Sequence, residues 1–441
     1  MAVGTETARE VPKAPTGFRR TFHALGNRNY RLFWLGQLLS QSGTWMRQTA
    51  QGWLVLQLTG SAFALGLVTA MQFIPILLFS LFGGVLADRL PKRRTLLVTQ
   101  SVMLVQATAL AVLTTTGQVR LGHLYVLSAV LGLAMAIDNP TRQAFVSELV
   151  GPDDLPNAVA LNSTVFNATR IVGPAVAGVL IAAAGVGLPF TVNAVSYLAV
   201  LGGLLLMRPG EFFSGRVRAR AGVFSEIGEG LRYAVRTPDT ALILLLMGVL
   251  GIFGYNFSVI LPLLARDVLH TGPAGFGTLT SAMGVGSLLA ALGLAYHGRA
   301  SRRTVLAGAA GFSLLLVAAA LSRVWLLTLP LLAALGFCSI VFTATANTRL
   351  QLLTPPELRG RVLSIYMLLF AGTTPLGSVI VGILADHQGV ARAIVELGGI
   401  CALGVIVALL YLRATRARLA PDGVAPDPVV SQPAPKPAAT G

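Results

Sequence analysis

Twelve apolar stretches, each about as long as a membrane-spanning helix, divide this sequence of 441 residues. A spanning helix needs about 20 mostly apolar residues. Only 11% of the residues are charged, whereas soluble domains have about 25%, and the mean hydropathy is +0.73. We therefore expect an all-α membrane protein in a lipid bilayer. The twelve centres lie near residues 45, 75, 104, 130, 170, 197, 251, 285, 313, 336, 372 and 401.

The 33 Lys and Arg lie in short clusters between these stretches. A nucleic-acid-binding protein would instead gather them on one surface, so we expect no nucleic-acid partner. Cytoplasmic loops of membrane proteins have an excess of Lys and Arg. We therefore expect a multi-pass protein of the cytoplasmic membrane with both termini in the cytoplasm. With this orientation, six basic residues fall in spans or outer loops, namely Arg47, Arg120, Arg170, Arg266, Arg323 and Arg392.

The two halves of the sequence repeat one another. Thr141 and Arg142 match Thr348 and Arg349, and two stretches have glycines at intervals of five and then seven residues. Internal repeats are typical of secondary transporters, whose substrate site lies at mid-membrane between the repeats. We therefore expect two six-helix bundles. The matching glycines are Gly173, Gly178 and Gly185 in the first half and Gly377, Gly382 and Gly389 in the second.

The connection between the halves contains Phe224, Ile227, Leu231 and Val235, which share one helical face. Such a helix lies along a membrane surface. The expected organisation is a cytoplasmic tail (1–28), the first bundle (29–208), a linker with the amphipathic helix (209–238), the second bundle (239–413) and a disordered tail (414–441).

No arrangement of residues indicates an enzyme. No lysine follows a Gly-x4-Gly pattern, so the chain has no ATP-binding loop, and transport would need another energy source. Cys338 and Cys401 lie in apolar segments, and the five histidines are scattered. We expect no catalytic residue, no metal site and no cofactor.

A polar stripe runs along the first apolar stretch, where five polar residues at intervals of four and three share one helical face. Lipid cannot satisfy these side chains, so either a water-filled cavity or hydrogen bonds between helices must do so. We favour the cavity. The stripe consists of Gln37, Gln41, Thr44, Gln48 and Gln51.

Two arginines lie deep in the first half of the sequence. Arg170 shares a helical face with Ser163 and Asn167, and a cation within the membrane needs a cavity or a partner. Arg47 lies beside the polar stripe, where it could instead snorkel to the surface. We expect both to attract an anionic substrate. In the second half, Tyr255, Asn256, Thr343 and Asn347 could complete the pocket or simply pack between helices.

A loop motif and several longer segments resemble a known family. Gly84 to Arg93 is similar to the loop signature G-x-x-x-D-R-x-G-R-R of the major facilitator superfamily, although Pro91 and Lys92 depart from it. Residues 138–150 and 155–178 resemble its transmembrane secretion effector branch. The resemblance covers about residues 28–413. It implies two six-helix bundles that export a small molecule by alternating access, coupled to protons.

The resemblance also implies roles for two sets of residues. A charged latch would hold the inner ends of the bundles together in the outward-open state, although the same residues could merely supply positive charge to the cytoplasmic side. A set of small residues would form a pivot between the bundles, although it could be plain packing. The latch would consist of Gly84, Asp88, Arg89, Lys92, Arg93 and Asp138, and the pivot of Gly173, Pro174, Gly178, Gly284, Gly286, Gly377 and Gly382.

Proton coupling rests on the resemblance alone, because no carboxylate lies at the centre of an apolar stretch. Asp138, near the inner face, is our candidate for the proton-carrying group. We expect a monomer with a small-molecule substrate. The alternatives are a lipid or metabolite carrier of the same fold and a membrane sensor or scaffold that transports nothing.

Overall fold

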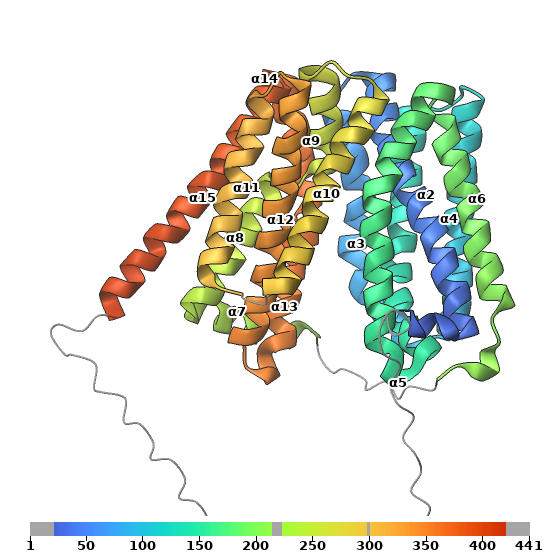
Figure 1. The fold of residues 1–441 in the computed structure, drawn as a ribbon, viewed down its shortest axis with the longest axis horizontal. Coiled ribbons are helices and arrows are strands. Elements are labelled where there is room, and N and C mark those ends of the chain that lie inside the picture. Colours follow the sequence, from blue (N-terminus) through green and yellow to red (C-terminus); the bar gives the residue numbers. More distant parts are fainter. Residues whose placement is uncertain (1–21, 214–222, 298–299, 420–441) are drawn as a thin grey trace, which may run out of the picture.

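The computed structural model describes residues 22–213, 223–297 and 300–419, and almost all of them are helical. Figure 1 shows two groups of helices side by side. The first group consists of α2 (Arg28–Thr59), α3 (Ala62–Arg89), α4 (Lys92–Thr115), α5 (Leu121–Ala184) and α6 (Gly187–Leu206). The second consists of α8 (Pro238–Phe253), α9 (Phe257–Leu263), η3 (Leu264–Val268), α10 (Pro273–His297), α11 (Arg302–Leu321), α12 (Trp325–Leu353), α13 (Pro356–Ala371), α14 (Thr374–Gln388) and α15 (Val390–Leu419).

Local sequence sets several helix bounds. The side chains of Asn27, Ser61 and Ser301 accept backbone N–H groups at the starts of α2, α3 and α11, as side chains of this kind do at helix N-termini. Gly60 ends α2 in a left-handed conformation, with φ of 66°, which glycine adopts without steric cost.

The 64-residue helix α5 is bent at Gly151, where φ is 70° and ψ is 178°. A straight helix of that length would measure about 96 Å, which is about three times the thickness of the hydrocarbon core of a bilayer. Because Pro152 follows the glycine, the chain cannot continue the helix across this point. The two arms, 121–150 and 152–184, are therefore separate passes.

Nine helices within the described ranges are long and apolar enough to cross a membrane, and α8 together with α9 and η3 forms a tenth candidate bent by 41°. α2 is not among them, although many of its residues are buried against α5 and α6. Its polar stripe lowers its hydropathy. The expected twelve passes result when the arms of α5 are counted separately and α2 is included.

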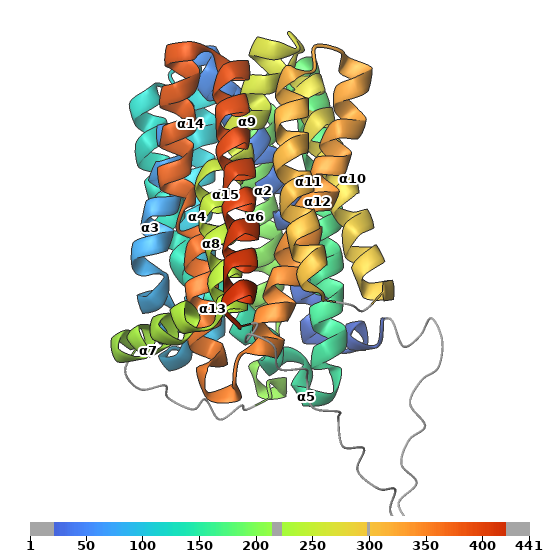
Figure 2. The ribbon, with the colours of Figure 1, turned by 90° about the vertical axis from the view of Figure 1, so that its left-hand side faces the viewer.

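The linker helix α7 (Val223–Arg236) lies across one end of the bundles in Figure 2. It packs on α13 and α8, and the Tyr233 hydroxyl donates to the Leu353 carbonyl at 2.9 Å. Leu231 and Val235 are exposed, as a helix at a membrane surface requires. α15 continues to Leu419, past the boundary expected at residue 413. The two predicted tails otherwise lie outside the described residues, apart from η1 (His23–Gly26) and the residues beside it.

We call the end with α7 the inner end, after the orientation that the charges predict, and the opposite end the outer end. The bundles meet mainly where α3 packs on α14 and α5 packs on α10. Small residues allow these contacts in the outer half: a Cβ added to Gly66 would overlap the Ser378 carbonyl, and one added to Gly178 would lie 2.6 Å from the Pro273 carbonyl oxygen. Towards the inner end, α3 exposes Phe82 and Val85. The second bundle also makes hydrogen bonds to the turn between α2 and α3, at the outer end. Because these contacts close the outer end, we describe the conformation as inward-facing.

Candidate functional site

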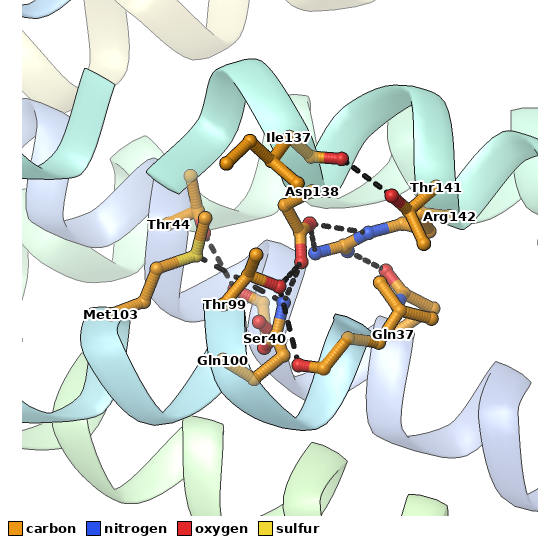
Figure 3. Close-up of polar contacts among 11 residues, drawn as sticks. Gln37, Ser40, Thr44, Thr99, Gln100, Met103, Ile137, Asp138, Thr141 and Arg142 are labelled. Atoms are coloured by element: carbon orange, nitrogen blue, oxygen red, sulfur yellow. Dashed lines mark hydrogen bonds and ion pairs between the residues drawn. The ribbon is translucent and has the colours of Figure 1, made fainter. Parts of the chain in front are cut away.

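Asp138 lies at the centre of a buried polar cluster within the first bundle (Figure 3). Its side chain is wholly buried in the first arm of α5. Thr99 Oγ1 and Gln100 Nε2, both on α4, donate to the carboxylate at 2.7 and 2.8 Å. Arg142, one helical turn further along α5, donates through Nε at 3.0 Å and forms an ion pair with it. Hydrogen bonds and an opposite charge thus compensate the burial of this carboxylate.

Arg142 also connects this cluster to α2, because its guanidinium donates to Gln37 Oε1. One ion pair therefore joins side chains from α2, α4 and α5. The sequence pattern predicted Asp138 as a functional residue but not Arg142, Thr99 or Gln100. The spacing of four residues between Asp138 and Arg142 is a helical ion-pair signal that could have identified Arg142.

The structure does not bring the six expected latch residues together. Lys92 is buried and pairs with Glu148 at 2.6 Å, not with Asp138. Arg93 donates to the carbonyl of Leu204 at 2.7 Å, near the end of α6. In this conformation Asp138 bonds with Thr99, Gln100 and Arg142 instead.

The other three latch residues, Gly84, Asp88 and Arg89, lie in open surroundings. Asp88 and Arg89 are exposed, and no ion pair joins either to another described residue. A Cβ added to Gly84 would meet no atom within 4 Å. Within the described part of the chain, Asp88 and Arg89 therefore make no hydrogen bond or ion pair with the second bundle in this conformation.

A second charged cluster lies at the inner end of the other bundle. Asp239, at the start of α8, pairs with Arg302 at 3.0 Å and with Arg349 at 2.5 Å. Arg349 is the counterpart of Arg142 in the internal repeat. Each bundle thus connects an arginine of its fourth pass to a polar side chain of its first pass, Gln37 in one and Asp239 in the other.

Hydrogen bonds between helices satisfy most of the polar stripe on α2. Besides the bond to Gln37, Gln51 Nε2 donates to Ser128 at 3.0 Å and Gln48 Nε2 donates to Ser258 of α9 at 3.1 Å. Thr44 donates within its own helix, and Gln41 is half-buried. The hydrogen-bonding alternative therefore holds for Gln37, Gln48 and Gln51. A cavity of about 20 Å³ adjoins the stripe between α2, α3 and α9, which is room for about one water molecule.

Arg47 lines this cavity and is only 2% exposed. Its Nη1 donates to Gln51 Oε1 at 2.5 Å, while its Nε has no hydrogen-bond partner among the described residues. The snorkelling alternative is wrong, because the side chain does not reach the surface.

Arg170, on the second arm of α5, faces the other bundle. It is half-buried, and within the described ranges it has no hydrogen bond or ion pair. Its guanidinium lies within electrostatic reach of the Tyr255 hydroxyl. Asn167 and Ser163, one and two turns away, donate only to carbonyls of their own helix.

Tyr255 belongs to an aromatic cluster in the second bundle. Its ring stacks on Phe312 with centroids 4.7 Å apart and meets Phe257 and Phe370 edge-on at 5.9 and 5.8 Å. Tyr255 lies at the break between α8 and α9. The other polar residues expected nearby bond locally: Asn256 donates to Ile252, Thr343 donates to Ser339, and Asn347 accepts from Gln351.

The pivot glycines divide into two groups. Three of them allow close contact between the bundles: Gly178 against Pro273, Gly284 against Ile171, and Gly382 against Ala62 and Phe63. The Pro174 carbonyl faces Gly277 across the same boundary. The others pack within their own bundle: Gly173 against Trp45, Gly286 against Ala333, and Gly377 against Ile252 and Asn256.

Sequence comparison finds similarity to one family and to several transport proteins. The sequence model of a family described as "transmembrane secretion effector" matches residues 20–436. A staphyloferrin A transporter from Staphylococcus aureus is 26% identical over 83% of this chain and 92% of its own length. The multidrug efflux pump Tap from Mycolicibacterium fortuitum is 28% identical over 85% and 93%. The enterobactin exporter EntS from Shigella boydii is 25% identical over 85% and 88%.

Solved structures of transporters share the fold. A peptide transporter POT matches with a TM-score of 0.69 at 14% identity, covering 91% of this chain and 96% of its own. A bacterial homologue of the human lysosomal transporter Spinster, in an inward-facing conformation, has a TM-score of 0.66 at 14% identity, covering 89% and 98%.

Proposed function

The chain belongs to the transmembrane secretion effector family, and we propose that it exports a small molecule across the cytoplasmic membrane by alternating access, driven by protons. The observation that carries the proposal is the inward-facing arrangement of the bundles, which meet at α3–α14 and α5–α10. A cargo that enters from the inner end stops below these contacts, and opening them while the inner ends close would release it outside.

We place cargo recognition between Arg170 and the aromatic cluster around Tyr255. A guanidinium that lacks a partner within a membrane attracts an anionic group, and the rings offer flat apolar faces. The two sides of this site belong to different bundles. Bound cargo would therefore contact both bundles and affect their movement relative to each other. The surroundings of this cargo site would consist of Arg47, the polar stripe and the residues near Asn256 and Thr343.

The inner latch would close in the opposite conformation. Here Asp88 makes no hydrogen bond or ion pair with any residue that the structure describes, and the N-terminus of α13, which begins at Pro356, is the positive end of a helix dipole on the other bundle. A carboxylate that docks there would favour the outward-open state. Arg89 would add to the contact, while Lys92 and Arg93 hold the start of α4 to their own bundle.

Asp138 is our candidate for proton coupling, since it is a wholly buried carboxylate near the inner end. Its protonation would leave Arg142 without a counter-charge. Arg142 in turn contacts Gln37 on α2, so the change would reach the helix that lines the boundary between the bundles.

The test is accumulation of a compound panel in cells that make or lack the protein, with and without an uncoupler. The panel contains anionic aromatic compounds, cationic drugs and macrolides. We expect lower accumulation of at least one class in cells with the protein, and the uncoupler should abolish the difference. Equal accumulation of every class would contradict export, and a difference that survives the uncoupler would contradict proton coupling alone.

A further inference from the structure

The turn between α2 and α3 is held by two charged residues of the other bundle. The Asp386 carboxylate, near the end of α14, accepts three hydrogen bonds at the start of α3. The donors are the backbone N–H groups of Ala62 at 2.7 Å and Phe63 at 3.0 Å and the hydroxyl of Ser61 at 2.6 Å. The first N–H groups of a helix lack partners within it, and an anion at that end also interacts favourably with the helix dipole.

Arg266 acts on the preceding helix. Its Nη1 donates to the Leu56 carbonyl at 3.0 Å and its Nη2 to the Gly60 carbonyl at 2.9 Å, at the end of α2. The Leu56 carbonyl also accepts the Gly60 N–H at 3.0 Å, so Arg266 adds a second donor there, and a cation suits the end of a helix. One turn of the first bundle is thus bound through both of its helix termini, with an anion and a cation each at the favourable end.

The segment around Asp386 repeats the segment around Asp88. Gly382-Ile-Leu-Ala-Asp386 at the end of α14 matches Gly84-Val-Leu-Ala-Asp88 at the end of α3. The two helices pack on each other and run in opposite directions, since α3 begins at the outer end and α14 ends there. The two copies of the pattern therefore lie at opposite ends of one helix pair.

The two copies are in opposite states in this conformation. A Cβ added to Gly382 would lie 2.7 Å from the Ala62 carbonyl oxygen and 2.8 Å from Phe63 Cα, whereas one added to Gly84 would meet nothing within 4 Å. Asp386 accepts three hydrogen bonds from the facing bundle. Asp88 makes no hydrogen bond or ion pair with another described residue.

We infer that Gly382, Asp386 and Arg266 form an outer lock, the counterpart of the inner latch at Gly84 and Asp88, and that closing one requires opening the other. Gly382 allows α14 to approach the start of α3, Asp386 binds that start, and Arg266 binds the end of α2. Loss of the lock favours the outward-open state, whereas loss of the latch favours the inward-open state. The inference rests on the proposed alternating access, but it concerns a conformational equilibrium that exists without cargo.

The test measures how fast a membrane-impermeant maleimide labels a cysteine at position 69 from outside. Thr69 is 8% exposed, lines the small cavity between α2, α3 and α9, and lies about two helical turns from the start of α3 at the outer end. The background is Cys338→Ala/Cys401→Ala with Thr69→Cys. Asp386→Asn should raise the labelling rate about 3- to 10-fold, as loss of a favourable charge at a helix terminus implies. Arg266→Gln should raise it as well.

Asp88→Asn is the matched control, because it makes the same chemical change in the other copy of the pattern. It should lower the labelling rate. Gly382→Ala should raise the rate because its methyl group would strike Ala62 and Phe63, and Gly84→Ala, which meets open space here, should not.

An unchanged rate in both Asp386→Asn and Gly382→Ala would overturn the inference, as would a shift of Asp386→Asn and Asp88→Asn in the same direction. Elution as a single symmetric peak from a sizing column identifies variants that fold. Failure of the export proposal would appear separately, as an absence of transport by the unchanged protein, whatever the labelling rates are.

Discussion

At the scale of single residues, the Asp138–Arg142 pair shows what the sequence could and could not specify. Four residues on one helix place the two charges together, so this contact follows from sequence alone. The partner of Lys92 does not, because Glu148 is distant in the chain and meets it only when α4 packs against α5. Lys92 and Asp138 have separate partners in this conformation, and the latch expected for the outward-open state stays a prediction.

Removal of Arg142 should destabilise the protein strongly. Arg142→Ala leaves the wholly buried Asp138 carboxylate without its counter-charge, which costs about 3 to 5 kcal/mol. Thermal unfolding in detergent should show a clearly lower Tm. The double variant Asp138→Asn/Arg142→Gln should recover most of that loss, and an equally unstable double variant would contradict the explanation.

Neutralising Arg170 should change cargo selection. We expect Arg170→Gln to reduce export of an anionic aromatic compound about tenfold, which corresponds to about 1.4 kcal/mol, and to spare its uncharged ester. Arg392→Gln is the control, because that arginine is exposed in an ion pair at the outer end. Equal losses for acid and ester would indicate a structural role for Arg170.

At the scale of helices, the sequence predicted where the spans lie better than it predicted what surrounds each helix. The apolar stretches predicted the spans, and the spacing of Gln37, Gln48 and Gln51 predicted a polar face on α2. What satisfies that face could not be predicted, because its partners come from three distant points: Arg142, Ser128 and Ser258. Periodicity reports which face is polar but not what lies opposite.

The bend of α5 gives a prediction at this scale. Gly151→Ala forces alanine into a left-handed conformation at φ of 70°, which costs about 1 to 2 kcal/mol. Its methyl group would also lie 3.0 Å from the Phe213 ring. We expect a lower Tm. Gly202→Ala in α6, where a Cβ meets nothing within 4 Å, should match or exceed the unchanged protein.

At the scale of the whole molecule, the internal repeat predicted two bundles but not how the bundles are arranged relative to each other. Packing within each bundle is compatible with both the inward-facing and the outward-facing conformation. The hydrophobic pattern of the sequence is therefore the same for both conformations. The difference lies in a few contacts, such as those of Gly382 and Asp386 with the start of α3.

A covalent link at the outer end should therefore arrest transport. Ser61 Oγ and Asp386 Oδ2 lie 2.6 Å apart, so Ser61→Cys/Asp386→Cys should form a disulfide under mild oxidation. Export should stop and then return after reduction. Each single cysteine variant is the control, and continued export by the fully oxidised pair would show that the outer ends need not separate.

The polar stripe of α2 also has a consequence for biogenesis. This helix is made before its partners, because its side chains bond to residues 77, 105 and 210 positions further along the chain. Unsatisfied polar groups in hydrocarbon cost several kcal/mol each, so α2 is a poor candidate for early release into lipid. We therefore expect α2 to stay beside the insertion machinery, or beside a chaperone, until its partners as far as Ser258 have been synthesised.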